Sequence, residues 1–135
     1  MLGLTFSRRL AILSGIALPI VETARRWRDW PGPIEQWPFW LDDYVVGVLL
    51  IVAALASWRT RRNAAWLTAA WGVATGLMLG STLAQYGHIV NPELGDDPSG
   101  VAHEWVLLAK IGILTVCALG LVTSMRRDEG DSITR

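Results

Sequence analysis

Cysteine is almost absent from this chain of 135 residues, which contains Cys117 and no second cysteine. A single cysteine excludes an intrachain disulfide and a metal site built from several thiolates. Cys117 lies in an apolar run, where a free cysteine usually behaves as a small buried apolar side chain. We therefore expect Cys117 to be a buried, inert thiol.

The chain also lacks the short motifs of common enzymes and nucleic-acid-binding proteins. It has no glycine-rich phosphate loop, no nucleophile elbow and no nucleic-acid motif. Its two halves both follow a helix–loop–helix pattern, but their residues do not match, which argues against an inverted-repeat transporter. These absences favour a non-enzymatic protein that binds no nucleic acid, and they give no reason to predict a cofactor.

Formal charge is scarce along four stretches of the chain. Hydrophobic residues make up 52% of the sequence, and the mean hydropathy is positive. A helix that crosses a bilayer needs about 20 mainly apolar residues. Four segments approach or reach this length, at about 8–27, 39–58, 64–87 and 102–125. The third is the clearest, because no formal charge occurs between Arg62 and Glu93.

These segments predict an all-α, integral membrane bundle of four transmembrane helices. Residues 1–127 form its single domain, with an interfacial loop at 28–38 and an outer loop at 88–101. Residues 128–135 are expected to be a mobile tail. The lipid bilayer is accordingly the first partner of the chain.

Basic residues are unevenly divided between the two sides that these spans would create. Eight fall on the side of the two termini and four on the other. The positive-inside rule therefore places both termini in the cytoplasm of a cell with a bacterial-type inner (plasma) membrane.

A stretch rich in tryptophan and proline, residues 22–43, connects the first two segments. It contains half of the eight tryptophans, namely Trp27, Trp30, Trp37 and Trp40. Tryptophan prefers the membrane interface, so we interpret these residues as interface anchors, with a lid or docking surface as the alternative. The neighbouring Arg25, Arg26 and Arg28 are candidates to bind lipid phosphates.

Two charged residues are predicted to lie inside the membrane on the outer side. Glu22 lies five residues inward of Trp27, and Lys110 lies five residues inward of Trp105. With a helical rise of 1.5 Å per residue, each charge lies roughly 7–8 Å below its tryptophan. Because an unpaired charge at that depth is costly, we expect Glu22 and Lys110 to form an ion pair.

Other polar residues approach the same side and complete a predicted polar cluster. Its members are Glu22, Asp42, Asp43, Gln85, His103, Glu104 and Lys110. The first interpretation is structural, with ion pairs that hold the helix ends together and Arg25 and Arg26 as further partners. The second is an open polar pocket for a proton, an ion or a lipid headgroup. The third is a metal or haem site on His88 and His103, for which no HxxxH, HExxH or CxxC spacing exists.

Small residues recur at every fourth position of the third segment. They are Thr68, Gly72, Gly76, Gly80 and Ala84. Such a ridge lets another helix approach closely. We expect it to pack against segments within the chain, with homodimerisation as the alternative.

The sequence thus favours a small, non-enzymatic inner-membrane protein that acts as an accessory or scaffold subunit of a larger membrane partner. The competing hypothesis is a small carrier or proton/ion-translocating protein that uses Glu22, Asp43 and Lys110. A further alternative is a membrane enzyme that acts on a lipid or quinone.

Overall fold

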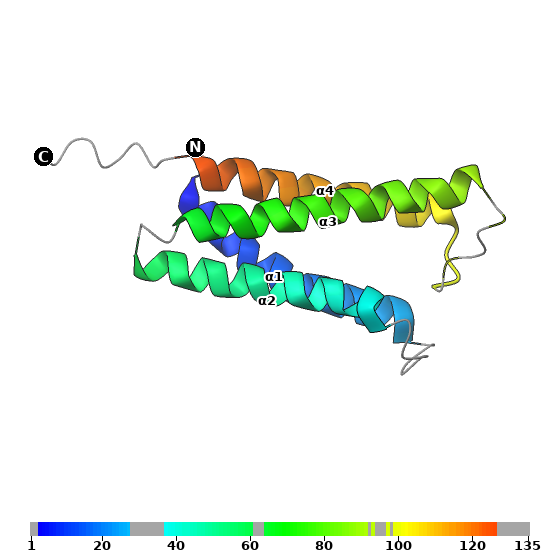
Figure 1. The fold of residues 1–135 in the computed structure, drawn as a ribbon, viewed down its shortest axis with the longest axis horizontal. Helices are drawn as coiled ribbons and strands as arrows, with labels where there is room; N and C mark the ends of the chain where they lie inside the picture. Colours follow the sequence, from blue (N-terminus) through cyan, green and yellow to red (C-terminus); the bar gives the residue numbers. More distant parts are fainter. Residues whose placement is uncertain are drawn as a thin grey trace, which may run out of the picture.

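The chain folds into four long helices, which Figure 1 shows as two adjacent pairs. The computed structural model describes residues 3–27, 37–60, 64–91, 93, 97 and 99–126. The helices are α1 (Leu4–Arg26), α2 (Trp37–Arg59), α3 (Ala64–Val90) and α4 (His103–Met125). No strand occurs within these described ranges.

The predicted all-α bundle is confirmed, since each of the four helices is long and apolar enough to cross a membrane. This is the pattern of a multi-pass membrane protein. The predicted boundaries differ from the observed ones in three places. α1 begins at Leu4, α2 already includes residues 37–38 of the expected loop, and α3 continues to Val90, beyond the expected start of the outer loop at 88.

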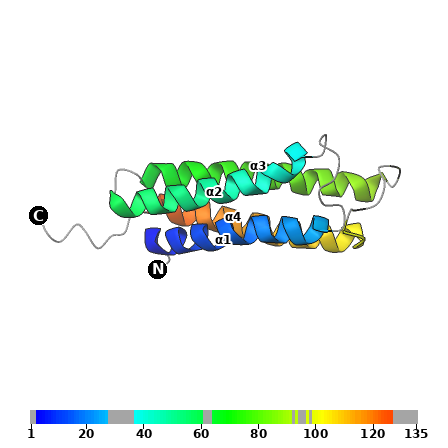
Figure 2. The same cartoon turned by 90° about the horizontal axis from the view of Figure 1, so that it is seen from below.

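The helices form a ring in which each packs on the next and α4 returns to α1. Figure 2 shows α1 running beside α4, and α2 beside α3. We call the end where α1 begins and α4 ends the termini end, and the opposite end the cavity end. Towards the cavity end, the α1–α2 pair separates from the α3–α4 pair (Figure 1).

The termini end contains most of the buried core. Leu50, Leu67 and Trp71 are fully buried there. The Trp71 indole Nε1 donates to Ser7 Oγ at 2.9 Å, and Ser7 Oγ donates to the Gly120 carbonyl at 2.9 Å. These bonds connect α3, α1 and α4 across the ring, and they satisfy the polar atoms that this packing buries.

Three glycines permit the closest helix contacts. A Cβ on Gly15 of α1 would lie 2.6 Å from the Gly47 carbonyl oxygen of α2, and a Cβ on Gly120 would overlap the Trp71 ring. Hence α1 and α2 cross with backbones almost touching, and the Trp71 ring lies flat on the backbone of α4.

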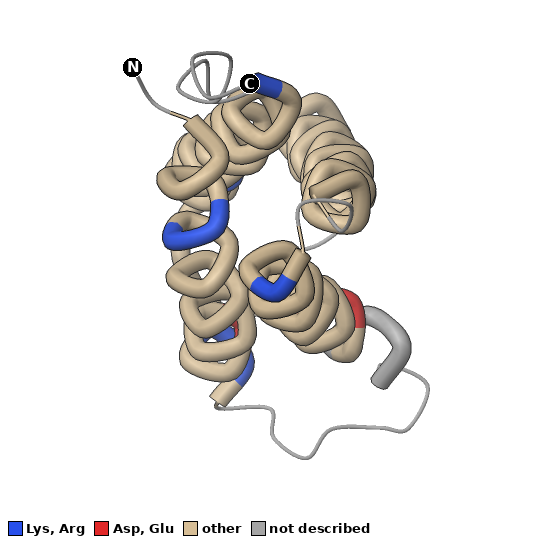
Figure 3. The backbone as a smooth tube through the Cα atoms, turned by 90° about the vertical axis from the view of Figure 1, so that its left-hand side faces the viewer, with Lys and Arg blue, Asp and Glu red and all other residues tan. Residues whose placement is uncertain are grey.

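The outer surface of the bundle is apolar, as expected of helices in lipid. Leu13, Val45 and Leu83 are each more than 60% exposed. Figure 3, seen from the termini end, shows charged residues near the helix ends and uncharged residues along most of their length.

The small-residue ridge of α3 is not covered by another helix, and its members Gly76, Gly80 and Ala84 border a cavity between the two helix pairs. Cβ atoms added to Gly72, Gly76 and Gly80 would meet no atom within 4 Å, and all three residues are exposed, as is Ala84. The prediction that the ridge packs within the chain is therefore wrong. The small residues that do pack closely lie elsewhere, at Gly15, Gly47 and Gly120.

Candidate functional site

A cavity of about 730 Å³ lies between the two helix pairs at the cavity end. Its volume falls within the roughly 300–1,000 Å³ typical of small-molecule sites. Three basic and four acidic side chains line it, together with two histidines and the amide of Gln85. The charged ones are Glu22, Arg25, Arg26, Asp42, Asp43, Asp97 and Lys110. Because the two signs nearly balance, the cavity suits a ligand that carries both.

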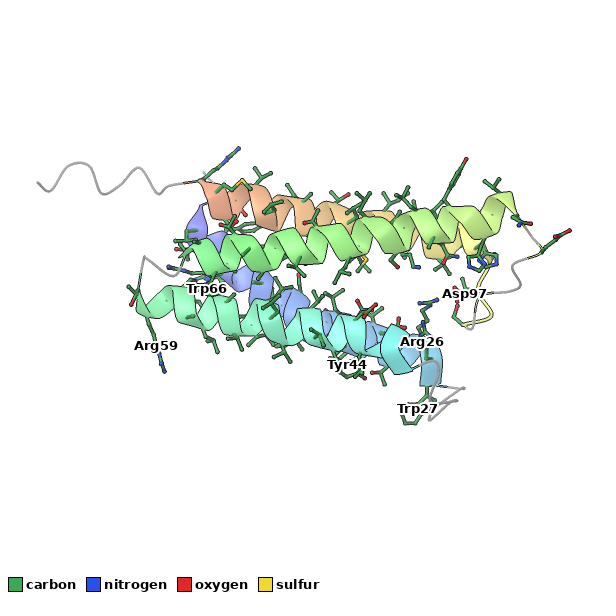
Figure 4. The ribbon with its side chains drawn as sticks, in the orientation of Figure 1. Arg26, Trp27, Tyr44, Arg59, Trp66 and Asp97 are labelled. Carbon is green, nitrogen blue, oxygen red and sulfur yellow. The ribbon has the colours of Figure 1, made fainter. Side chains whose placement is uncertain are left out.

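One wall of the cavity is a chain of ion pairs at the end of α1. Glu22 accepts from Arg25 at 3.2 Å and also from Arg26, three and four residues later on the same helix face. Arg25 also forms an ion pair with Asp97, in which Nη2 lies 2.9 Å from Oδ2. Figure 4 shows Arg26 extending from α1 into the space between the helix pairs, near Asp97. The Glu22 charge, buried within the bundle, is therefore compensated locally.

Asp97 lies in the loop before α4 and is held by several donors. Ser99 donates to Asp97 Oδ1 from its backbone nitrogen at 2.9 Å and from its hydroxyl at 2.6 Å. Burial alone would raise the pKa of Asp97, but these bonds and the Arg25 guanidinium outweigh it and lower the pKa to about 2. Asp97 is therefore an anion that joins α1 to the start of α4.

Lys110 enters the cavity from α4 on the opposite side. Its Nζ donates to the Ser81 carbonyl at 3.3 Å and to Gln85 Oε1 at 3.2 Å, both on α3. The expected Glu22–Lys110 ion pair is wrong, because the described partners of Glu22 are Arg25 and Arg26. The described partners of Lys110 are therefore neutral acceptors, and the side chain lines the cavity.

Asp42 and Asp43 line the cavity from the first turns of α2. Asp43 is partly buried, and within the described part of the chain its carboxylate has no hydrogen bond or ion pair. The cavity therefore has acidic groups on the α2 side and an amine on the α4 side.

The two histidines line the cavity together, His88 from the last turn of α3 and His103 from the first residue of α4. The His88 and His103 rings are stacked with centroids 5.3 Å apart, and His103 Nδ1 is 2.7 Å from Gln85 Nε2. Nδ1 of His88 is buried without a hydrogen-bond partner among the described groups. No set of three His, Cys, Asp or Glu side chains in the described ranges is placed to hold a metal. Two stacked rings by themselves do not form a ligand set.

The structure brings together most of the predicted polar cluster, since Glu22, Asp42, Asp43, Gln85, His103 and Lys110 all line the cavity. Glu104 does not, and it is exposed in the first turn of α4. Asp97 was missed. The signal for it was present in Asp97-Pro98-Ser99-Gly100, because aspartate two residues before serine commonly accepts from that backbone nitrogen.

Much of the tryptophan-rich stretch lies outside the described residues. This applies to Arg28 and Trp30, and to the side chains of Trp37 and Trp40. The tail at 128–135 also lies outside them. Trp27 is described, and it is 70% exposed at the end of α1 (Figure 4).

Comparisons with known proteins add no analogue. No family model, no curated protein and no solved structure matches this chain.

Proposed function

We propose that this protein is a small, non-enzymatic membrane protein that binds a zwitterionic group in the cavity and acts as an accessory subunit of a larger membrane assembly. One observation carries the binding proposal. Acidic groups on α2 and the amine of Lys110 on α4 line a single cavity, and among the described residues no ion pair joins them. A ligand with a cationic and an anionic group satisfies both walls, whereas an ion of one sign leaves the other wall uncompensated.

The polar atoms of the cavity support this proposal. Asp42 and Asp43 are acceptors for an ammonium group, and Lys110 donates to a phosphate or carboxylate. Among the described groups, the buried Nδ1 of His88, which also lines the cavity, has no hydrogen-bond partner. Charge-assisted bonds of this kind are each worth about 1.5–3 kcal/mol when they are made in a partly buried site.

The test is calorimetric titration of the protein, in nonionic maltoside micelles, with phosphoethanolamine. Inorganic phosphate and ethanolamine, which carry its two charges separately, are titrated in parallel. We expect phosphoethanolamine to bind more tightly than either. Asp43→Asn should weaken its binding by about tenfold, equivalent to the loss of one charged contact. Lys110→Gln should have a similar effect.

Glu104→Gln is the matched control, because it removes an exposed carboxylate of α4 that does not line the cavity. It should leave the affinity unchanged. The proposal fails if phosphoethanolamine does not bind, or if Asp43→Asn and Glu104→Gln weaken binding equally.

A second candidate function is proton or ion translocation, and the specific observation that favours it is Asp43. A carboxylate inside a membrane span with no described bonding partner can take up and release a proton. In proteoliposomes with a trapped pH dye, this function predicts a proton flux that Asp43→Asn abolishes. Flux equal to that of empty liposomes would exclude the role.

The orientation of the bundle follows from its basic residues. Arg8, Arg9, Arg59 and Arg126 lie at the termini end. By the positive-inside rule, we propose that this end faces the cytoplasm of a bacterial-type inner membrane and that the cavity end faces outside. A green fluorescent protein fused to the C-terminus should then fluoresce, whereas an alkaline phosphatase fused there should be inactive.

The accessory role is supported by the exposed ridge of α3. Gly72, Gly76 and Gly80 are uncovered and offer a backbone surface on which a helix of a membrane-protein partner or of a second copy can pack; at Gly76 and Gly80 this surface borders the cavity. Gly76→Leu should therefore reduce the amount of partner, or of dimer, recovered from native membranes in a mild detergent. Unchanged recovery would remove the ridge from this role.

A further inference from the structure

A groove runs along the outside of the seam between α1 and α4. It has two hollows, of about 490 Å³ and about 310 Å³, and both are lined by Val21 of α1 and Ala109 of α4. Because the hollows share residues from both helices, they form one continuous path. The path starts near Ser99, before α4, and ends near Cys117, past the middle of α4.

Both hollows of the groove are mainly apolar, and its polar groups are concentrated at the cavity end. The hollow at the cavity end includes Arg25 and Ser99 and is flanked by Trp105. The deeper hollow is lined almost entirely by aliphatic groups, such as those of Leu18, Ile113 and Val116. An amphiphile in a membrane has the same order, with its headgroup at the interface and its chain below.

Arg25 links the groove to the cavity, since it lines both. A guanidinium has five N–H donors. The described bonds of Arg25 run to Glu22 from Nη1 and to Asp97 from Nε and Nη2, one from each nitrogen. The remaining donors are available to a phosphate oxygen, and the acidic groups of α2 lie in the cavity beyond.

We propose that this groove binds one acyl chain of a zwitterionic amphiphile, whose phosphate is bound by both Arg25 and Lys110 and whose ammonium group reaches the acidic groups of α2 in the cavity. This inference rests on the proposed function and deepens it, because it identifies the zwitterion as the headgroup of a lipid rather than a free solute.

The acyl chain contributes to the binding free energy through its packing in the groove and not through hydrophobic transfer. Lipid tails are as apolar as the groove, so leaving the bilayer gains little free energy by itself. A groove between two helices nevertheless surrounds a chain on more sides than neighbouring lipids do, and the close contacts add dispersion energy. Specific retention therefore needs both the polar end and an unobstructed groove.

The experiment uses the full chain in phosphatidylglycerol nanodiscs that contain a trace of lysophosphatidylethanolamine with a diazirine at the end of its chain. After irradiation, labelled peptides are mapped by mass spectrometry. We expect labels on α1 and α4 around Leu18 and Val116, at several times the level on the exposed face of α2. Ala109→Phe, which fills the groove where its two hollows meet, should reduce this labelling by about fivefold. Ala69→Phe, the same change at an exposed alanine of α3 outside the groove, should leave it unchanged.

The outcomes of the labelling and the titration together distinguish failure of the groove from failure of the zwitterion site. If phosphoethanolamine binds in the cavity but the diazirine on the acyl chain labels all lipid-facing helices equally, the zwitterion site is supported. The inference that the zwitterion is a lipid headgroup is then wrong. If the groove is labelled but Asp43→Asn changes neither the labelling nor phosphoethanolamine binding, the acyl-chain site in the groove is supported. The zwitterion site in the cavity is then wrong. Equal labelling in Ala109→Phe and Ala69→Phe overturns the groove.

Discussion

At the termini end, the four helices meet through buried apolar side chains and near-contact backbones; at the cavity end, the two helix pairs meet through charged groups around a hollow. Trp71 is fully buried at the first, and its ring rests on Gly120. At the second, the buried groups are Glu22, Gln85 and Asp97. The same four helices are therefore joined by packing at one end and by electrostatics at the other.

The contrast shows how a small membrane bundle can combine a closely packed end with a polar cavity at the other end. Close packing needs small residues where backbones cross, and the chain provides these at Gly15, Gly47 and Gly120. Charged side chains cannot interdigitate in this way, and the helix pairs separate where Glu22, Asp43 and Lys110 line the cavity. We therefore expect substitutions at the two ends to differ in how much they lower the free energy of unfolding and in how this loss depends on pH.

The largest effect is expected from Gly120→Ala at the termini end. The added Cβ would overlap the Trp71 ring, which has no free space because it is fully buried. Overpacking of this kind costs about 3 kcal/mol when the backbone has to move. Chemical unfolding in detergent, followed by circular dichroism, should show this loss in the free energy of unfolding. A stability equal to that of the wild type would contradict the close packing of α3 on α4.

A smaller loss is expected from Ser7→Ala. Removing the hydroxyl leaves the Trp71 Nε1 without its acceptor, while the Gly120 carbonyl keeps the Thr123 hydroxyl as a donor at 3.2 Å. An unsatisfied buried donor costs about 2 kcal/mol. Ser7→Thr, which keeps the hydroxyl, should recover part of the loss. If alanine and threonine are equally harmful, packing volume and not the hydrogen bond determines the effect.

The sequence was sufficient to predict four membrane helices, because apolar length alone identifies a span. Depth below the tryptophans also placed Glu22 and Lys110 near one level, and both line the cavity. Depth does not determine which side chains point at each other, so the predicted pair was wrong. The spacing of Glu22 to Arg25 and Arg26 did contain the correct partners, since residues three and four apart share a helix face.

The ridge of α3 illustrates the other limit of the sequence. A four-residue period predicts that small residues share a face, but it does not identify which neighbour covers that face. In the structure no described part of the chain covers Gly72, Gly76 or Gly80, while isolated Gly15 and Gly47 carry the α1–α2 crossing. Single glycines at a crossing leave no periodic signal, so they could be found only from the packed helices.

The third prediction concerns energetic coupling at the cavity end. A double-mutant cycle between Glu22→Gln and Arg25→Gln should give a coupling energy of about 2 kcal/mol, because the two groups are in direct contact inside the bundle. The cycle between Glu22→Gln and Lys110→Gln should give a clearly smaller value, because these groups have separate partners. Equal couplings would restore the direct pair between Glu22 and Lys110.

The fourth prediction concerns acid. The pKa of Asp97 is about 2 in the folded chain, against an ordinary value of 3.8. Because the folded pKa is lowered, its stabilisation is complete above the ordinary value and is lost as the pH falls towards 2. The loss should be about 1–2 kcal/mol, with Asp97→Asn already destabilised at pH 6 and less sensitive to acid. Thermal unfolding between pH 6 and pH 2 measures this difference. Parallel pH curves for the two proteins would show that the Arg25–Asp97 pair does not hold the cavity end.

The smallest expected effect separates the exposed ridge from the buried crossings. Gly76→Ala adds a Cβ that meets nothing within 4 Å, so the substitution should gain up to about 1 kcal/mol of helix propensity. The same substitution at Gly15 meets the Gly47 carbonyl and Ile51 and should destabilise the bundle. Measuring both in detergent as isolated chains compares one chemical change at two sites. If Gly76→Ala destabilises the native assembly but not the isolated chain, the ridge is covered by a partner, because only an approaching helix would meet the added methyl group.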